Sequence, residues 1–210
     1  MRVISGTARG RQLRAAAETR PTADLIKGAI FSMLEALAYK RGFEPDEEGN
    51  LAAALAWPRV LDLFAGSGGL GIEALSRGAT SAEFVDHQRE AVRVLQSNLR
   101  QTDLGERARV HQSSVEGALR RVAGPIDLVF LDPPYADADE LRHALKLLGA
   151  SALLTPSSVV VLEQESKSEP PDAIGELPLA NTRRHGHTRI SLYAQETDEP
   201  VHQTDESNPS

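Results

Sequence analysis

Cysteine is absent from the sequence. Without it the chain holds no disulfide bridge, no zinc site with thiolate ligands and no cysteine nucleophile, and it suits a reducing compartment. Long hydrophobic runs are absent as well: no apolar stretch approaches about 18 residues, and no positively charged start leads into an apolar segment. We therefore expect neither a membrane span nor a secretory signal, and we expect a cytoplasmic location.

The composition that is present is that of a globular domain. The 210 residues are 40% hydrophobic and 25% charged, with 16 Gly and 12 Pro. These values argue against collagen, coiled coil and wholesale disorder. Since a domain usually takes roughly 100 to 200 residues, the length predicts one full domain and little else.

The charge of the chain is unevenly distributed. The net charge of −7 is, taken alone, unfavourable for binding nucleic acid. Residues 1–41, however, carry a net charge of +5, whereas residues 44–48 carry −4 and residues 196–210 carry −5. Because we expect both acidic stretches to be solvated, the folded remainder keeps a basic N-terminal end. The N-terminal residues expected to face a nucleic acid are Arg2, Arg9, Arg11, Arg14 and Arg20.

Changes in composition divide the chain into four segments. Residues 1–41 begin with an arginine-bearing hairpin or extended arm, for which a solvated edge strand is the alternative, and continue into an amphipathic helix. Residues 42–58 turn acidic and then alanine-rich, which indicates a linker or insertion. Residues 59–195 form the main domain, and residues 196–210 form a disordered acidic tail.

The main domain alternates apolar strands with helices. Near-continuous apolar strands in such a βα pattern indicate a mostly parallel sheet with helices on both faces. The segment "IGELPLANTRRHGHTRISLYAQ" has two extended runs around Gly186, which predict an antiparallel hairpin closing the sheet. The predicted parallel strands are residues 59–66, 81–86, 108–112, 126–132 and 157–165.

A glycine-rich loop follows the first of these strands. In "VLDLFAGSGGLGIEAL", Gly66, Gly68 and Gly71 form a G-x-G-x-x-G pattern between a strand and a helix. Glycines let the backbone approach a ligand, and the helix start offers unpaired N–H groups. Asp86 ends the next strand, where a carboxylate accepts hydrogen bonds from ribose hydroxyls. The pattern predicts an adenosine-type cofactor and leaves a dinucleotide and S-adenosylmethionine open.

Two further features separate these cofactors. Asp62, within the first strand, would repel a pyrophosphate but attract a ligand that carries an ammonium and a sulfonium. The segment "DPPY" at 132–135 ends the fourth strand, at the edge where open α/β sheets bind ligands. Its prolines lack N–H donors, so that Asp132 and a carbonyl would accept from a planar amine while Tyr135 stacks on its ring. An ordinary Asp-Pro turn is the alternative.

These motifs resemble a known family. "LDLFAGSG" and "DPPY", in this order, resemble class I S-adenosylmethionine-dependent amino-methyltransferases. "RPTADLIKGAIFSML", "LGIEALSRGA" and "GHTRISLY" are similar to the small-subunit ribosomal RNA methyltransferase D family, over about residues 1–195. The resemblance implies a Rossmann-like α/β fold, S-adenosylmethionine as cofactor, and methylation of a guanine exocyclic amine (N2) in 16S rRNA, free or in the assembling small subunit. We expect a monomer.

The expected site residues follow from the motifs and the resemblance together. In many methyltransferases an Asp after the third strand contacts the adenine; this chain has serines there, whose hydroxyls would serve. For Phe64, a place in the core is the alternative to a place beside the cofactor. The expected cofactor-binding residues are Asp62, Phe64, Ala65, Gly66, Ser67, Gly68, Asp86 and Ser114. The expected catalytic residues are Asp132, Pro133, Pro134 and Tyr135.

Two other functions remain possible from the sequence. The same "DPPY" chemistry would serve a methyltransferase that acts on adenine or on a protein amide. A dinucleotide oxidoreductase or a silent binding module would leave "DPPY" without a role.

A second basic cluster lies around Gly186. Arg183 and Arg184 are expected to contact RNA phosphate, with Arg189 and two histidines nearby, and a solvated hairpin tip is the alternative. The histidines have no carboxylate or cysteine neighbours at ligand spacing, so we predict no metal site.

Overall fold

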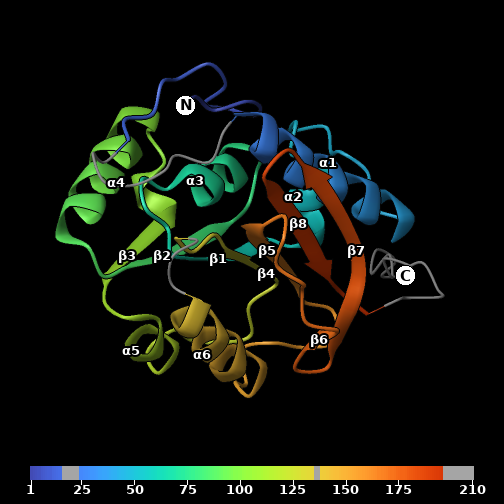
Figure 1. The fold of residues 1–210 in the computed structure, drawn as a ribbon. Helices are drawn as coiled ribbons and strands as arrows, with labels where there is room; N and C mark the ends of the chain where they lie inside the picture. The colour runs from blue at the N-terminus through green and yellow to red at the C-terminus, as the bar shows by residue number, and fades with distance from the viewer. Residues whose placement is uncertain (16–23, 135–137, 196–210) are drawn as a thin grey trace, which may run out of the picture.

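A computed structural model describes residues 1–15, 24–134 and 138–195, and within them the chain forms an α/β fold (Figure 1). One eight-stranded sheet has the order β3-β2-β1-β4-β5-β8-β7-β6. Its strands are β1 (Arg59–Leu63), β2 (Ser81–Asp86), β3 (Ala108–Gln112), β4 (Leu128–Leu131), β5 (Val159–Glu165), β6 (Ala173–Ile174), β7 (Leu177–His185) and β8 (Thr188–Tyr193). The helices are α1 (Asp24–Lys40), α2 (Ala52–Ala56), α3 (Gly69–Ser76), α4 (Arg89–Thr102), η1 (Gly105–Arg107), α5 (Val115–Leu119) and α6 (Ala138–Gly149).

The sheet confirms the predicted mixture of parallel and antiparallel strands. Strands β1 to β5 pair in parallel, and β8 runs antiparallel between β5 and β7. The chain order reverses between β1 and β4, and open α/β sheets bind ligands at the carboxyl ends of strands beside such a switch. Because Glu165 pairs with Thr188, the β7–β8 turn lies at that same carboxyl edge.

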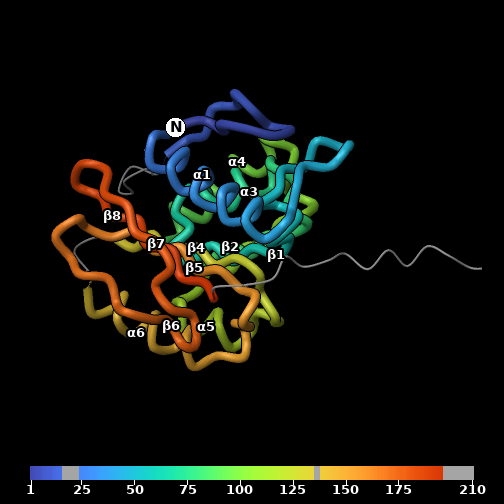
Figure 2. Tube along the Cα trace, turned by 90° about the vertical axis from the view of Figure 1, so that its right-hand side faces the viewer, coloured from blue at the N-terminus to red at the C-terminus, as the bar shows by residue number. Residues whose placement is uncertain are grey.

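Helices cover both faces of the sheet (Figure 2). Alternate residues of each strand point to opposite faces, and β4 shows this directly: Phe130 belongs to one hydrophobic cluster and Leu131 to the other. The first cluster is completed by α1, α2, α3 and α4, with Phe31 of α1 against Phe130 at 5.8 Å between ring centroids. The second cluster is completed by α5 and α6.

The stretch predicted as a linker or insertion is more than a connector. Its second half forms α2, and Ala52, Ala53, Ala54 and Trp57 are buried. The Trp57 indole N–H donates to the carbonyl of Ser157 at 3.3 Å. The composition shift at residues 42–58 therefore marks a segment whose last part belongs to the core. A five-residue helix is too short for its periodicity to be recognised in the sequence.

The N-terminal arm folds back on itself and onto the main domain. Arg2 and Gln12 form an antiparallel bridge, and Val3, Ala8 and Leu13 are buried. The backbone N–H groups of residues 4 and 5 donate to the Glu73 carboxylate. Glu73 also pairs with Lys27 of α1 at 3.2 Å, and both side chains are fully buried. The arm, α1 and α3 are thus joined by one buried ionic cluster.

Three expectations concern residues outside the described ranges. These are the contact of Arg20 with nucleic acid, the stacking role of Tyr135 and the disordered tail at 196–210. In the part of the chain that is described, no helix is both long and apolar enough to span a membrane.

Candidate active site

The glycine loop joins β1 to α3 and adopts backbone conformations that few residues tolerate. Gly68 has φ +83° and stands immediately before α3. A Cβ on Gly68 would lie 2.3 Å from Cδ1 of Leu95, a residue of α4. The backbone angle therefore favours glycine there, and the buried Leu95 side chain of α4 would have to shift to admit a larger residue.

Phe64 also has a positive φ, of +62°. This conformation is a genuine outlier for a bulky side chain, and such strain concentrates at functional sites. Phe64 is partly buried and packs against the second hydrophobic cluster. The backbone at the start of the loop is therefore strained, and the Phe64 ring lies partly in the core.

Asp62 lies beneath the loop. It is 2% exposed, and its Oδ2 accepts a hydrogen bond from the Gly71 N–H at 2.8 Å. Burial raises the pKa of Asp62 to about 7; the Gly71 bond opposes this shift, and the charges of Asp132 and Asp86 add to it. The carboxyl group therefore holds the first turn of α3 in place, and its pKa depends on the charges of Asp132 and Asp86.

Asp86 binds the loop from the neighbouring strand. Its Oδ2 accepts from the Gly66 N–H and its Oδ1 from the Gln88 N–H, both at 2.8 Å. Each carboxylate oxygen has about two lone-pair sites, so both retain capacity for a ligand hydroxyl. The side chain is partly exposed. This arrangement suits the recognition of a ribose, as the sequence predicts.

The other predicted residues of the loop and of the strand ends make most of their hydrogen bonds through backbone N–H and carbonyl groups. The Ala65 N–H donates to the Val85 carbonyl at 2.9 Å, and the Ser67 carbonyl accepts from Asn98. Ser114 caps α5, because its Oγ accepts from the Gly117 N–H at 3.2 Å. The adjacent Ser113 N–H donates to the Asp86 carbonyl at 3.0 Å. The end of β3 therefore lies beside Asp86.

Asp132 follows β4 directly and is partly buried, Pro133 is buried, and Pro134 is exposed. Since β2, β1 and β4 are adjacent strands, Asp86, Asp62 and Asp132 meet at one edge of the sheet. Three acidic groups at this edge favour a positively charged ligand over a pyrophosphate.

A cavity of about 370 Å³ lies beside the two prolines. Its walls come from α6, the end of β5 and residues 168–171, and they are mostly apolar. Gln164 lines it, is buried, and its Oε1 has no hydrogen-bond partner among the described residues. Apolar walls with an unsatisfied acceptor suit a planar, partly polar ring.

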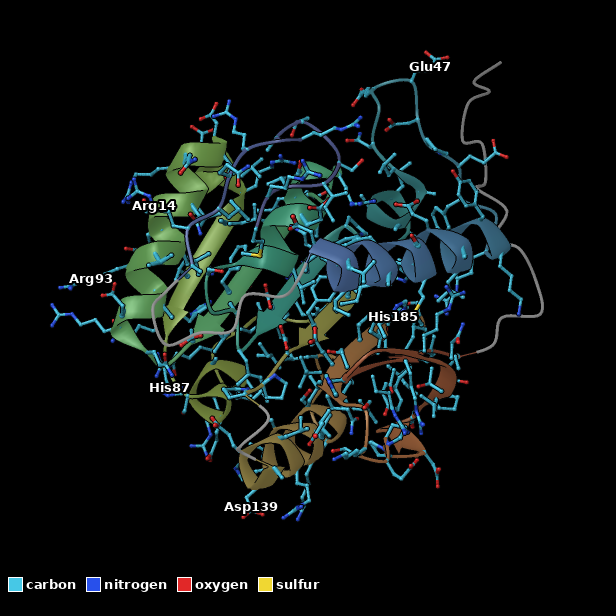
Figure 3. The ribbon with its side chains drawn as sticks, turned by 45° about the horizontal axis from the view of Figure 1, so that its top comes forward. Arg14, Glu47, His87, Arg93, Asp139 and His185 are labelled. Atoms are coloured by element: carbon cyan, nitrogen blue, oxygen red, sulfur yellow. The ribbon has the colours of Figure 1, made fainter. Side chains whose placement is uncertain are left out.

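The exposed basic residues lie on the arm and near the β7–β8 turn. Arg2, Arg9, Arg11 and Arg14 are exposed on the arm, and Arg14 lies beside α4 (Figure 3). Arg183 and Arg184 are exposed near the β7–β8 turn. Arg189 differs from this expectation: it is 3% exposed and pairs with Glu169 at 3.0 Å. It therefore secures the hairpin and is not available to RNA.

Asn98 is the site residue that the motifs did not reveal. Its side chain is fully buried and bonds both the glycine loop and the arm. The available signal was a polar residue on the apolar face of α4. Within the described ranges, no group of three or more His, Asp or Glu side chains is placed to hold a metal ion.

Comparisons with known proteins show the family of the chain. A family model described as conserved hypothetical protein 95 matches residues 1–194. The Bacillus subtilis protein YlbH is 37% identical over 198 residues, which are 92% of this chain and 98% of that protein. The Escherichia coli ribosomal RNA small subunit methyltransferase D is 29% identical, over 93% of this chain and 90% of its own. The solved structure of a hypothetical protein from Thermus thermophilus matches with a TM-score of 0.74 and 31% identity, covering 93% of this chain and 99% of that one.

Proposed function

The chain belongs to the family described as conserved hypothetical protein 95, and from this premise we propose that it transfers a methyl group from S-adenosylmethionine to the exocyclic amine (N2) of a guanine in 16S rRNA. The observation that carries the proposal is the meeting of the glycine loop, Asp62, Asp86 and Asp132-Pro133 at one edge of the sheet. The name of the Escherichia coli relative supports the choice of small-subunit rRNA.

The residues at this edge fit S-adenosylmethionine. When bound, it supplies a methyl group on a positively charged sulfur. The backbone of Gly66 to Gly68 would approach it closely, and Asp86 would accept from the ribose hydroxyls. The negative charges of Asp132 and Asp86, which help to raise the pKa of Asp62, favour its positive charge.

Asp132 and Pro133 would orient the target amine. An aromatic amine is a poor nucleophile because its lone pair is delocalised into the ring. The Asp132 carboxylate and the Pro133 carbonyl would accept its two hydrogens and direct the lone pair toward the methyl carbon. Once the amine carries the methyl group that the cofactor would supply, its surplus proton would leave to Asp132 or to water. Orientation and preorganised charge supply most of the rate.

No strong general base is needed for this step. A methylated aryl ammonium is far more acidic than a carboxylic acid with a pKa of about 3.9. Asp132 therefore acts by position. Tyr135, three residues after Asp132, would stack on a base that has left its helix, and the cavity beside Pro133 and Pro134 offers an apolar surface for that base.

Guanine matches a carboxylate acceptor better than adenine does. Guanine presents a ring N–H beside its amine, and one carboxylate accepts from both. Adenine presents an acceptor nitrogen at the equivalent edge, which a carboxylate repels.

The RNA would approach from the basic side of the edge. Arg14, bonded through Asn98 to the glycine loop, and the pair Arg183 and Arg184 would lie beside the site. Arg9 and Arg11 would extend the basic surface toward the ends of α3 and α4. All of them would bind phosphates without reading sequence. Either free 16S rRNA or the assembling small subunit would satisfy this surface, with a single copy of the chain.

Methyl transfer to 16S rRNA tests the proposal. Labelled S-adenosylmethionine is incubated with naked 16S rRNA and with small subunits that lack the modification, and nuclease digests are analysed by mass spectrometry. We expect N2-methylguanosine at a single position. A methyl group on adenosine, or calorimetric binding of NAD in place of S-adenosylhomocysteine, would refute the proposed reaction.

A further inference from the structure

Asn98 occupies an unusual place on α4. The face of this helix that packs on the domain is apolar, with Ala91, Leu95 and Leu99 buried, and Asn98 lies on the same face with no exposed surface. A buried amide is stable only when its donors and acceptor are satisfied. The partners of Asn98 therefore explain why an amide is retained there.

Those partners belong to two segments far apart in the sequence. The Asn98 Nδ2 donates to the Ser67 carbonyl of the glycine loop at 2.9 Å. The same Nδ2 donates to the Arg14 carbonyl at 2.9 Å, and Oδ1 accepts from the Arg14 N–H at 2.9 Å. Two N–H donors and one oxygen are thereby used, so the amide bridges the loop to the backbone of the arm.

We infer that Asn98 couples occupancy of the glycine loop to the position of the RNA-facing arm, so that cofactor and rRNA each tighten the binding of the other. The inference rests on the proposed function for its RNA partner. If ligand binding fixes the Ser67 carbonyl, it also fixes the Asn98 amide, because a displaced amide would leave buried groups unpaired. The Arg14 backbone, held by the same amide, is then ordered, and this fixes the point from which the exposed Arg14 side chain extends.

The loop and α4 are packed closely enough to transmit such a constraint. A Cβ on Gly68 would overlap the Leu95 side chain, which lies one turn before Asn98. The coupling is reciprocal by thermodynamic necessity: whatever factor the cofactor adds to RNA affinity, RNA adds to cofactor affinity.

Gln101 provides a matched control on the same helix. Its Nε2 donates to the Gln12 carbonyl at 2.8 Å, and its own carbonyl accepts from Arg11. These bonds hold the arm but do not reach the glycine loop. A Gln101→Ala variant therefore weakens the anchoring of the arm and leaves the bridge intact.

Hydrogen exchange on the unaltered full chain is the first test. Saturating S-adenosylhomocysteine is expected to slow exchange of the Arg14 amide several-fold, because that N–H is bonded to Asn98. Unchanged exchange at Arg14 would overturn the inference. This measurement needs neither RNA nor a variant.

Affinity for a 16S rRNA fragment, with and without S-adenosylhomocysteine, is the second test. We expect the ligand to tighten RNA binding about fivefold or more in the unaltered protein. The quantity compared is the ratio of RNA affinity with S-adenosylhomocysteine to RNA affinity without it. Asn98→Asp keeps an acceptor for the Arg14 N–H but has no donor for the Ser67 carbonyl, so this ratio should fall to one. Gln101→Ala should bind RNA more weakly with the ratio preserved. An equal ratio in Asn98→Asp and the unaltered protein would contradict the inference.

The two proposals fail in different ways. If the protein binds no rRNA, yet S-adenosylhomocysteine still slows exchange at Arg14, the proposed substrate is wrong and the bridge between loop and arm stands. Should Asn98→Asp not fold, the exchange result on the unaltered chain decides the matter.

Discussion

Asp132 stands where β4 ends, beside the strand that leads into the glycine loop. Its place explains its proposed task better than its acidity does, since the amine it orients needs no strong base. The position of this acceptor, at the end of β4, separates Asp132 from other acidic residues nearby.

Replacing Asp132 tests this position. Asp132→Ala is expected to lower kcat/KM for methyl transfer by about 100-fold or more, because one preorganised acceptor is lost. Asp139→Ala is the matched control: Asp139 is an exposed residue of α6 paired with Arg142, and its loss should leave the rate unchanged. Full activity in Asp132→Ala would remove Asp132 from the mechanism.

Asp62 makes the stability of the ligand-free protein depend on pH. Its folded pKa is about 7, above the ordinary value of 3.8. Between these values the folded state binds more protons than the unfolded state, so stability falls as pH rises from about 4 to about 7, by up to about 1.4 kcal/mol per pH unit.

The variant Asp62→Asn isolates that contribution. Asparagine keeps an oxygen for the Gly71 N–H but does not ionise. Urea unfolding at pH 5 and pH 7 should therefore show a smaller loss of unfolding free energy in Asp62→Asn than in the unaltered protein. Identical losses would mean that the Asp62 carboxyl group ionises as it does in the unfolded chain.

At the scale of elements, the start of α3 is fixed from three sides. Asp62 of β1 holds Gly71, Asp86 of β2 holds Gly66, and Leu95 of α4 packs against Gly68. A loop held in this way presents its backbone to a ligand with little reorganisation. The Leu95 side chain of α4, which packs against Gly68, is thus part of the site.

Gly68→Ala tests this element. The new Cβ would meet Leu95 at 2.3 Å in a backbone with φ +83°, so we expect a loss of stability of about 3 kcal/mol and much weaker binding of S-adenosylhomocysteine. Gly10→Ala is the control, because Gly10 has φ +84° but nothing within 4 Å of the added carbon. It should cost only the backbone penalty of about 1 kcal/mol and leave binding intact. An equal loss of unfolding free energy in both variants would show that the Leu95 side chain moves aside to admit the new Cβ.

At the scale of the whole molecule, the net charge of −7 conceals where RNA would bind. The arm and the β7–β8 hairpin come from opposite ends of the chain. The hairpin turn lies at the edge that holds Asp132, and Arg14 of the arm is bonded through Asn98 to the glycine loop at that edge. Affinity for RNA is therefore a property of this edge and is expected to be sensitive to salt.

Neutralising the arm measures that contribution. Replacing Arg9, Arg11 and Arg14 with Gln should weaken rRNA binding and lower the slope of log K against log salt by about 2. Replacing Arg120, Arg121 and Lys146 of the α5–α6 side, all exposed, is the control and should change neither quantity appreciably. If both triple variants behave alike, the RNA surface is not local to the arm.

The sequence by itself determined the alternation of strands and helices, the closing hairpin and the places of the two motifs at the ends of their strands. Periodicity and turn residues are local, so β1 to β5 and the glycine loop are recognisable without their neighbours. It did not reveal α2 and β6, which are too short to carry a period of their own.

Only the tertiary structure decided which groups meet. The burial of Asp62 on Gly71, the pairing of Arg189 with Glu169 and the bridge from Asn98 to Arg14 and Ser67 each join residues that no local pattern connects. The physical reason is that a polar side chain removed from water must find its partner in space, and packing of the whole chain chooses that partner.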